Sequence, residues 1–153
     1  MIPPLSQSPA ILADMLHDIP DSLRKQHRRP GKWSIHEHAC HLAQADLMIL
    51  ERFRTFAREE HPVFKLYLPG TTVEDNLMDL DLEEQMASFA VSRAAMVKFL
   101  NSYSSNVWQC SAEHPEYTQY SPYILLRHTL MHDHFHMYRI EELWLTRQEM
   151  LTR

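Results

Sequence analysis

Apolar residues recur every three or four positions in four segments of the chain, which is the spacing of an amphipathic helix. Prolines lie between these segments, where one helix ends or the next begins. We therefore predict helices over residues 8–19, 34–59, 81–104 and 121–146. Segments with the alternating pattern of a β-strand are nearly absent.

The predicted helix starts carry capping signals. Ser-Pro pairs stand at 8–9 and 121–122, and proline is favoured at the first helical position because its missing N–H leaves no donor unsatisfied there. Ser34, followed three residues later by Glu37, forms a capping box that satisfies two backbone N–H groups. A similar Asp-Glu pair opens the third helix.

Four helices without strands indicate an all-α protein, a single-domain up-down four-helix bundle over residues 1–153. In the first helix, Ile11, Met15 and Ile19 are spaced by four and predict its buried side. The connection over 60–80 is long for a compact domain, and such loops often serve as a lid or as a wall of a binding site.

Composition narrows the class of protein. The 153 residues suffice for one domain, and the presence of only two glycines disfavours β-sandwiches and leaves no glycine-rich phosphate loop. The net charge of -5 argues against a general nucleic-acid or membrane-surface binder. There is no apolar run of transmembrane length and no secretory signal, and Cys40 and Cys110 are too few for a disulfide scaffold. We expect a cytoplasmic protein.

Eleven histidines are the most unusual count. His128, His132 and His136 follow at intervals of four in the last predicted helix and share one face. Such spacing is a common way to present two imidazoles to one metal ion. The helical angles place His132 and His136 toward the interior and His134 toward solvent.

A second group of histidines lies near the start of the 34–59 helix. His36 falls in the first turn, where we expect it to be exposed, whereas His38 and His41 both flank the apolar stripe. Spacing alone does not choose between these two. With either one, His132 and His136 would complete a three-histidine metal site that leaves positions open for water or substrate, as in catalytic metal sites.

Two charged residues fall inside apolar stripes, Asp46 in the second predicted helix and Arg93 in the third. Because an unpaired charge in a core is costly, we predict that they are neighbours, as a buried ion pair or as groups facing the metal cavity. A basic cluster precedes the second helix and could dock an acidic partner, although such runs are usually solvated. Its members are Arg24, Lys25, Arg28, Arg29 and Lys32.

Several segments together resemble one known family. Residues 31–37, Gly-Lys-Trp-Ser-Ile-His-Glu, and the following His41-Leu42-Ala43 resemble the "GKWS…E…HL-A" segment of the DinB/YfiT-like superfamily. Residues 132–140 resemble its closing "H-D-x-x-H-x-x-x-I" motif, and Phe89 with Arg93 fits its "F-x-x-x-R". The likeness runs in the right order along nearly the whole chain.

The resemblance implies a four-helix bundle that holds one divalent metal ion, zinc or nickel, through three histidines. The histidine of the family's "HL" corresponds to His41, and its closing pair corresponds to His132 and His136. The resemblance thus selects His41 over His38. Despite the family's name, membership does not imply DNA binding.

Further residues are candidates around this site. We expect His128 either to support the metal ligands or to pack in the core. We expect Asp133 either to support the metal ligands or to face solvent. Trp33 is a candidate wall of the pocket. The family often has glutamine where Arg139 stands, and this cation is expected to pair with Glu142 or to contact an anionic substrate.

The family includes metal-dependent hydrolases and thiol-dependent S-transferases. A divalent ion held by three histidines can lower the pKa of water to about 7 for hydrolysis, or lower that of a low-molecular-weight thiol for transfer to an electrophile. We expect a metal-dependent enzyme that acts on a small-molecule substrate, and a homodimer by the general frequency of two-fold symmetry. The alternative is a non-catalytic, metal-braced module in which a fourth ligand, His38 or His128, closes the site.

Overall fold

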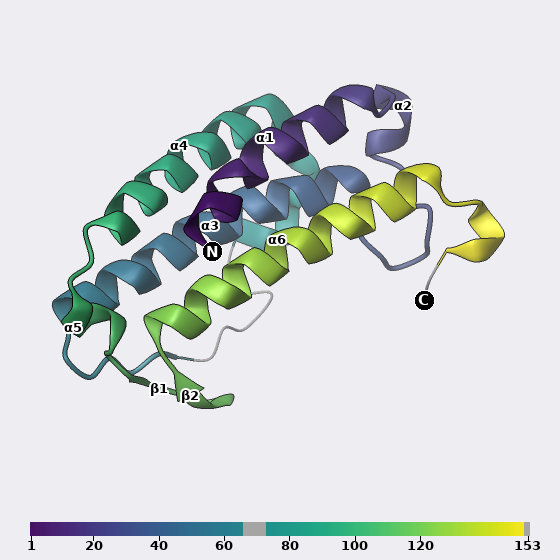
Figure 1. Ribbon diagram of the computed structural model, residues 1–153. Helices are drawn as coiled ribbons and strands as arrows, with labels where there is room; N and C mark the ends of the chain where they lie inside the picture. Colours follow the sequence, from purple (N-terminus) through teal and green to yellow (C-terminus); the bar gives the residue numbers. More distant parts are fainter. Residues whose placement is uncertain (66–72, 152–153) are drawn as a thin grey trace.

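Four long helices make up most of the protein in a computed structural model that describes residues 1–65 and 73–151 (Figure 1). The predicted four-helix bundle is therefore confirmed, and the last three helices begin and end within a few residues of the predicted limits. The four helices are α1 (Ile2–Asp18), α3 (Ile35–Arg58), α4 (Leu82–Asn101) and α6 (Pro122–Leu145).

Short elements connect the helices. They are α2 (Asp21–Arg24), the 3-10 helices η1 (Val73–Asp79) and η2 (Gln148–Met150), α5 (Ser105–Trp108), β1 (Ala112–His114) and β2 (Tyr117–Tyr120). The antiparallel β1–β2 hairpin was not predicted. A two-stranded hairpin is marginal by itself, and this one is fixed by Tyr120, which is 3% exposed and packs on the rings of Phe56 and Phe64.

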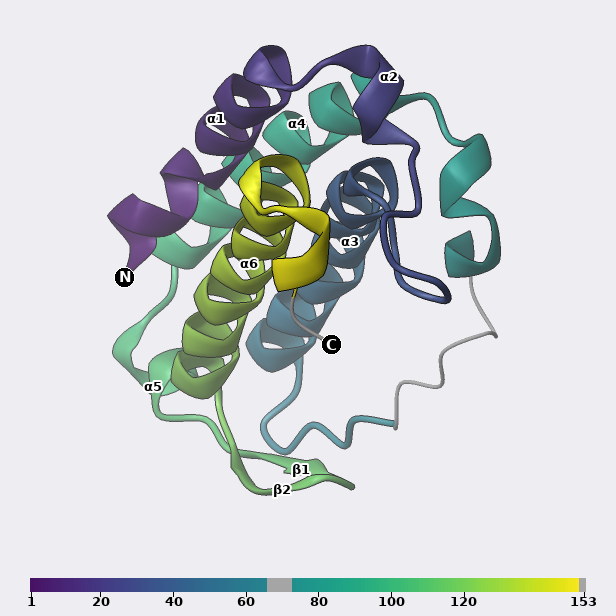
Figure 2. The same ribbon diagram turned by 90° about the vertical axis from the view of Figure 1, so that its right-hand side faces the viewer.

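The chain direction departs from a strict up-down order between α3 and α4. Asp46 of α3 contacts Arg93 of α4, and further along both helices Phe53 contacts Tyr103, just after α4 ends; these two helices therefore run parallel. α3 and α6 run antiparallel, and Figure 2 shows the helices packed around a shared interior. Parallel neighbours require a connection that returns along the bundle. The long connection predicted over 60–80 joins these two helices, and residues 66–72 of it lie outside the described residues.

Three helix starts have the expected caps. Ser34 accepts a hydrogen bond from the backbone of Glu37, whose side chain accepts one from the backbone of Ser34, so the capping box is complete. The side chains of Asp81 and Ser121 likewise accept from the backbone three residues ahead. Local sequence signals thus set the entry of α3, α4 and α6.

The predicted start of α1 is wrong. The helix begins at Ile2 with prolines in its first turn, so that Ser8 is buried and Pro9 lies inside the helix. Pro9 has no N–H to donate to the carbonyl of Leu5 four residues earlier, and that carbonyl instead accepts a hydrogen bond of 2.9 Å from Nη1 of Arg93.

The buried side of α1 also differs from the prediction. Ile11 is 44% exposed, because the helix begins six residues earlier than predicted and turns another face to the core. That face carries Leu5, Ser8, Leu12 and Leu16. Ile19, directly after the helix, is buried as expected.

The core consists of two apolar clusters along α3. One lies toward the hairpin and includes Phe53, Met96 and Leu125, and the other lies toward α2 and includes Phe89 and Ile140. In sequence, Asp46, Arg93 and Asp133 each fall between residues of the two clusters. The middle of the bundle is therefore charged.

The basic cluster before α3 is used largely within the molecule. Arg24 donates to the carbonyls of Leu16 and Ile19 at the end of α1. Arg28 donates to the carbonyls of Leu143 and Thr146 at the end of α6. Cations stabilise helix C-termini, where backbone carbonyls lack helical partners, so these arginines fasten helix ends. No helix among the described residues is both long and apolar enough to cross a membrane.

Candidate metal centre

Histidines from α3 and α6 meet at the interface of these two antiparallel helices. The Nε2 atoms of His41 and His132 lie 3.0 Å apart. His41, His132 and His136 each offer one nitrogen, and these atoms all lie within 4.8 Å of one another. We call these residues the three-histidine cluster. His136 is 5% exposed and His41 is 9% exposed, so the cluster is largely shielded from solvent.

The helical geometry accounts for this meeting. His132 and His136 lie one turn apart on α6, so their rings lie on the same face and meet edge to face, with centroids 4.5 Å apart. α3 presents His41 opposite both of them, with ring centroids 5.0 Å from His132 and 4.7 Å from His136. Three side chains from two rigid helices are thereby held without any loop residue.

His38 lies beside the three-histidine cluster and contacts one of its members, His136. Its Nδ1 is 2.8 Å from Nδ1 of His136, so one of the two rings donates a hydrogen bond and the other accepts it. This contact occupies Nδ1 of His136 and leaves Nε2 of that ring for the cluster. A hydrogen bond on the far nitrogen is how metal-binding histidines are usually oriented.

Burial keeps two members of the cluster, His41 and His136, in the uncharged form. It lowers the pKa of His41 to about 4. For His136, burial and the neighbouring histidines lower the pKa to about 2, and for His38, burial and the charge of Arg139 lower it to about 4. Neutral imidazole is the form that binds metal ions, so His41 and His136 are ready ligands at neutral pH, and His38 is neutral beside them.

The donor set fits a divalent ion. Two nitrogen ligands of a tetrahedral zinc ion lie about 3.4 Å apart, given bonds of about 2.1 Å. The 3.0 Å separation of His41 and His132, and the 4.8 Å limit for the whole cluster, are close to that spacing. Imidazole also suits nickel, copper and iron, so the ligands define a class of ion and not one element.

One pocket opens directly on the cluster. It has a volume of about 290 Å³ and lies between α3, the hairpin and α6, with His41 and His132 in its wall. We call it the histidine pocket. A second hollow, of about 360 Å³, lies beyond Trp33 and His38 and includes Lys32 and Arg139. A groove of about 760 Å³ between α1 and α4 is lined by none of the histidines.

Comparison with known proteins identifies the family. The sequence model of the DinB superfamily matches residues 5–140. The chain belongs to the DinB superfamily. Among solved structures, YfiT from Bacillus subtilis, described as a probable metal-dependent hydrolase with an unusual four-helix bundle topology, is similar in fold, with a TM-score of 0.79 and 22% sequence identity over 93% of this chain and 82% of that one. No curated protein sequence matches.

Other predicted site residues of this DinB-superfamily chain take different places. Trp33 packs on the cluster, with its ring centroid 4.7 Å from that of His41, and it follows Gly31, whose φ of +67° suits glycine. His128 lies in the wall of the histidine pocket beside Tyr117. Arg139 forms an ion pair with Glu142 and lines the hollow beyond Trp33.

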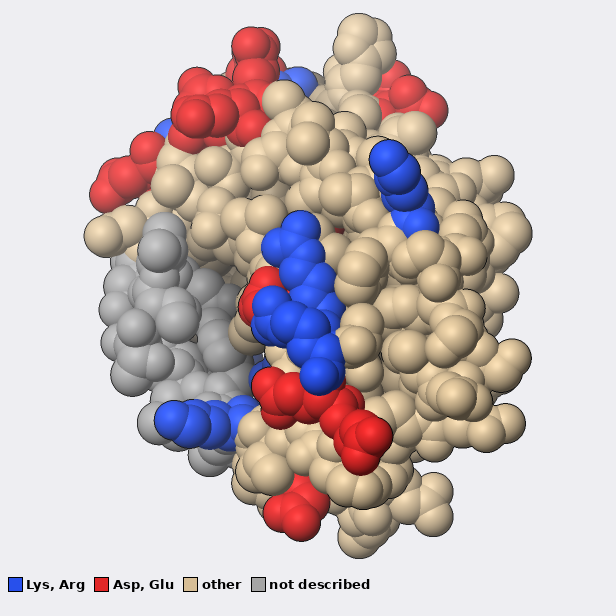
Figure 3. Space-filling model, turned by 90° about the vertical axis from the view of Figure 1, so that its left-hand side faces the viewer, with Lys and Arg blue, Asp and Glu red and all other residues tan. Residues whose placement is uncertain are grey.

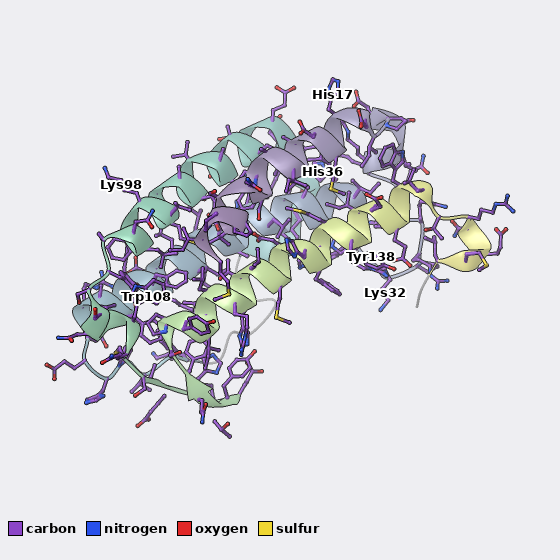
Figure 4. The ribbon with its side chains drawn as sticks, in the orientation of Figure 1. His17, Lys32, His36, Lys98, Trp108 and Tyr138 are labelled. Carbon is purple, nitrogen blue, oxygen red and sulfur yellow. The ribbon has the colours of Figure 1, made fainter. Side chains whose placement is uncertain are left out.

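Two expectations about exposure have opposite outcomes. His134 is exposed, as predicted. His36 is 2% exposed, contrary to the prediction, whereas His17 lies at the outer edge of the molecule in Figure 4. The Nε2 atom of His36 is 3.1 Å from the carbonyl oxygen of Leu77, because η1 covers the first turn of α3. Burial lowers the pKa of His36, and the charge of Lys25 adds to this.

Asp133 does not contact the histidines or solvent, contrary to both expectations. It follows His132 by one residue, which turns its side chain by about 100° toward the bundle interior. There it bonds to Arg93, with distances of 2.6 and 3.1 Å. Asp46 binds the same guanidinium at 2.8 Å, so the expected neighbours Asp46 and Arg93 lie together with a third member that spacing did not reveal.

This buried triad of Asp46, Arg93 and Asp133 is internally satisfied. Asp46 also accepts a hydrogen bond of 2.5 Å from Ser92. Burial opposes the charge of Arg93, but the bonds and charges of Asp133 and Asp46 raise its pKa above the ordinary value. Burial raises the pKa of Asp46 against the effect of Arg93, as expected when two carboxylates share one cation.

Proposed function

We propose that the protein is a metal-dependent hydrolase of a small-molecule ester or amide, with His41, His132 and His136 as the ligands of a divalent ion. The observation that carries this proposal is that two members of the three-histidine cluster, His41 and His132, lie in the wall of a pocket of about 290 Å³. A metal held only for stability does not need a pocket at its side, whereas a catalytic one needs access for substrate.

The protein supplies three ligands in this proposal, which leaves coordination positions open. Of the two candidates for a fourth ligand, His38 binds the far nitrogen of His136, and His128 belongs to the pocket wall one turn away. A bound divalent ion supplies Lewis acidity, which lowers the pKa of water and polarises a carbonyl group. The open positions favour catalysis over the metal-braced module.

The chain's own residues would bind the substrate and move protons. Hydrolysis adds water to the carbonyl carbon, breaks the C–O or C–N bond and releases an acid with an alcohol or amine. Burial lowers the pKa of His128, so its imidazole is neutral near pH 7 and can accept a proton from the attacking water and pass it to the leaving group. Trp33 covers the far side of the cluster and excludes bulk water there.

Pocket size favours hydrolysis over S-transfer. A transferase that joins a low-molecular-weight thiol to an electrophile must hold two organic molecules beside the metal. The histidine pocket, at about 290 Å³, is at the lower end of the range for small-molecule sites and holds one. Water, the second reactant of hydrolysis, needs little further space.

The test combines metal analysis with matched histidine variants. We expect the purified protein to bind about one zinc or nickel ion, and the loaded protein to hydrolyse members of a panel of nitrophenyl esters and nitroanilides. His132→Ala should lose both properties, whereas His134→Ala, an exposed neighbour on the same helix, should keep them. Turnover that requires an added thiol and an electrophile would replace hydrolase by S-transferase. Tight metal binding with a raised melting temperature but no turnover of either kind would support the braced module.

A further inference from the structure

Arg52 marks the end of the histidine pocket away from the metal site. A single face of α3 lines the pocket through His41, Ala45, Ile49 and Arg52, which are spaced by three or four residues. Arg52 follows His41 by eleven positions, about 16 Å along the helix axis. Side chains on a helix lean toward its N-terminus, so Arg52 leans toward the cluster.

The guanidinium of Arg52 has only neutral partners among the described residues. It donates a hydrogen bond of 3.3 Å to the hydroxyl of Tyr120, and its central carbon lies 5.6 Å from the ring centroid of Phe64. Arg54 and Arg58 on the same helix both form ion pairs with Glu51. Figure 3 shows this end of the molecule, where basic side chains gather next to acidic ones.

A partly buried cation without a counter-charge is poorly solvated, and it still has free donors. Guanidinium offers five N–H groups in a planar fork, and the contact with Tyr120 uses one of them. The fork matches the two oxygens of a carboxylate, and such charge-assisted pairs are about twice as strong as neutral hydrogen bonds. Among the residues that the structure describes, no carboxylate therefore pairs with Arg52 at this end of the pocket.

The rest of the pocket is suited to an apolar body. Tyr117 and Tyr120 stack with centroids 5.6 Å apart, and Ile49 and Leu125 add aliphatic surface. Of the described residues that line the pocket, one is acidic, Glu116, which is exposed at the turn of the hairpin. The negative charge of Glu116 at the rim of the pocket repels a bound anion, and Glu116 forms no ion pair with Arg52.

We propose that the substrate carries a carboxylate that binds Arg52, with its apolar or aromatic body on the tyrosines and its hydrolysable bond beside the three-histidine cluster. This inference rests on the proposed hydrolase function and defines its substrate class: a small ester or amide with a carboxylate at the end remote from the scissile bond. Arg52 is then a specificity-determining residue.

Binding can be tested without metal or turnover. The probes are 3-phenylpropanoate, its neutral counterpart 3-phenylpropanamide and the cation 3-phenylpropylamine, titrated into metal-free protein and into His132→Ala while backbone amide NMR shifts are recorded. We expect the carboxylate to shift the amides of Ala45, Ile49 and Leu125 and to bind at least about tenfold more tightly than the amide or the amine.

Variants of three residues identify the contact. Arg52→Gln should weaken binding of the carboxylate about tenfold or more and leave binding of the amide unchanged. Arg52→Lys should keep only part of the affinity for the carboxylate, and Glu116→Gln should raise this affinity. Arg54→Gln is the matched control and should bind as the wild type does. Circular dichroism and the melting temperature show that each variant is folded.

Several results would overturn the inference. These are equal binding of carboxylate and amide, carboxylate binding that survives Arg52→Gln, no binding at all, or shifts confined to the hollow at Lys32 and Arg139. A failure of the proposed function is separate from these, because a chain that binds the carboxylate through Arg52 but takes up no metal would refute the hydrolase and leave the anion site in place.

Discussion

Replacement of Arg93 by methionine tests how the centre of the bundle is held together. Arg93 is 1% exposed and carries bonds to Asp46, to Asp133 and to the carbonyl of Leu5. Methionine has a similar length and no charge, so Arg93→Met leaves two buried carboxylates without a cation and the carbonyl without its donor. We expect a large loss of stability without a large change in volume.

The size of the loss follows from the contacts. Removal of one partner from a buried ion pair costs about 3 to 5 kcal/mol, and Arg93 serves two partners, so we expect at least that loss. Domains of this size have a total stability of about 5 to 15 kcal/mol, so the variant should be near the limit of folding. Urea denaturation followed by circular dichroism at 222 nm measures the difference, with Arg54→Met, an exposed arginine on α3, as the control.

A neutral triple variant keeps the reasoning testable if Arg93→Met is too unstable to study. Asp46→Asn, Arg93→Met and Asp133→Asn together remove all three charges, and this variant should recover most of the stability lost by Arg93→Met.

The pH dependence gives a second check. In Arg93→Met, the pKa of Asp46 should rise further above its ordinary value, since burial already raises it. Because the raised pKa belongs to the folded state, protonation of Asp46 stabilises the fold. This stabilisation is fully present below the ordinary pKa of the carboxyl group and is lost as the pH rises through the raised pKa. The deficit relative to wild type should therefore be smaller near pH 4 than at pH 8. A deficit no greater than that of Arg54→Met, or independent of pH, would refute the account of the triad.

Three further predictions follow from the site and its caps. The metal-free protein should lose stability as the pH falls from about 6.5 toward 4. His38 and His41 are neutral in the folded protein, with pKa values of about 4, and they take up protons when it unfolds. Thermal melts at several pH values should show a smaller loss in His41→Gln. Zinc at a hundredfold excess over its dissociation constant should stabilise the wild type by about 2.7 kcal/mol but not His132→Ala, and a chelator should reverse this shift in melting temperature. Ser34→Ala should cost about 1 kcal/mol in urea denaturation because it removes half of the capping box, and a cost no larger than that of the exposed Ser111→Ala would contradict the capping argument.

Sequence reasoning succeeded where the signal was local. The caps at Ser34, Asp81 and Ser121 define helix starts through contacts within four residues, and such patterns can be read directly from the chain. The i,i+4 spacing of His132 and His136 likewise fixes their common face. The choice of His41 as the residue opposite them came from family resemblance and not from spacing.

Prediction from the sequence failed where residues far apart in the chain determine which side chains are buried and what they contact. His36 is buried because η1 covers it, and Asp133 turns inward because Arg93 lies there; neither partner is close in sequence. The contact of Arg52 with Tyr120 was also missed, since it depends on the hairpin, whose strands are too short to give a periodic signal. The sequence signal for this contact is the spacing of His41, Ala45, Ile49 and Arg52, which puts Arg52 on the same face of α3 as a predicted metal ligand.

Pro9 has a consequence for the register of α1. An ordinary helix could slide along its neighbours by a turn and exchange one set of apolar contacts for a similar one. In α1 the carbonyl of Leu5 is left without a helical donor by Pro9, and it is this carbonyl that binds the guanidinium of α4. A shift of one turn would offer Arg93 a carbonyl already bonded within the helix and would leave that of Leu5 unsatisfied in the core. A residue that weakens α1 as an isolated helix thus specifies the one position at which it docks.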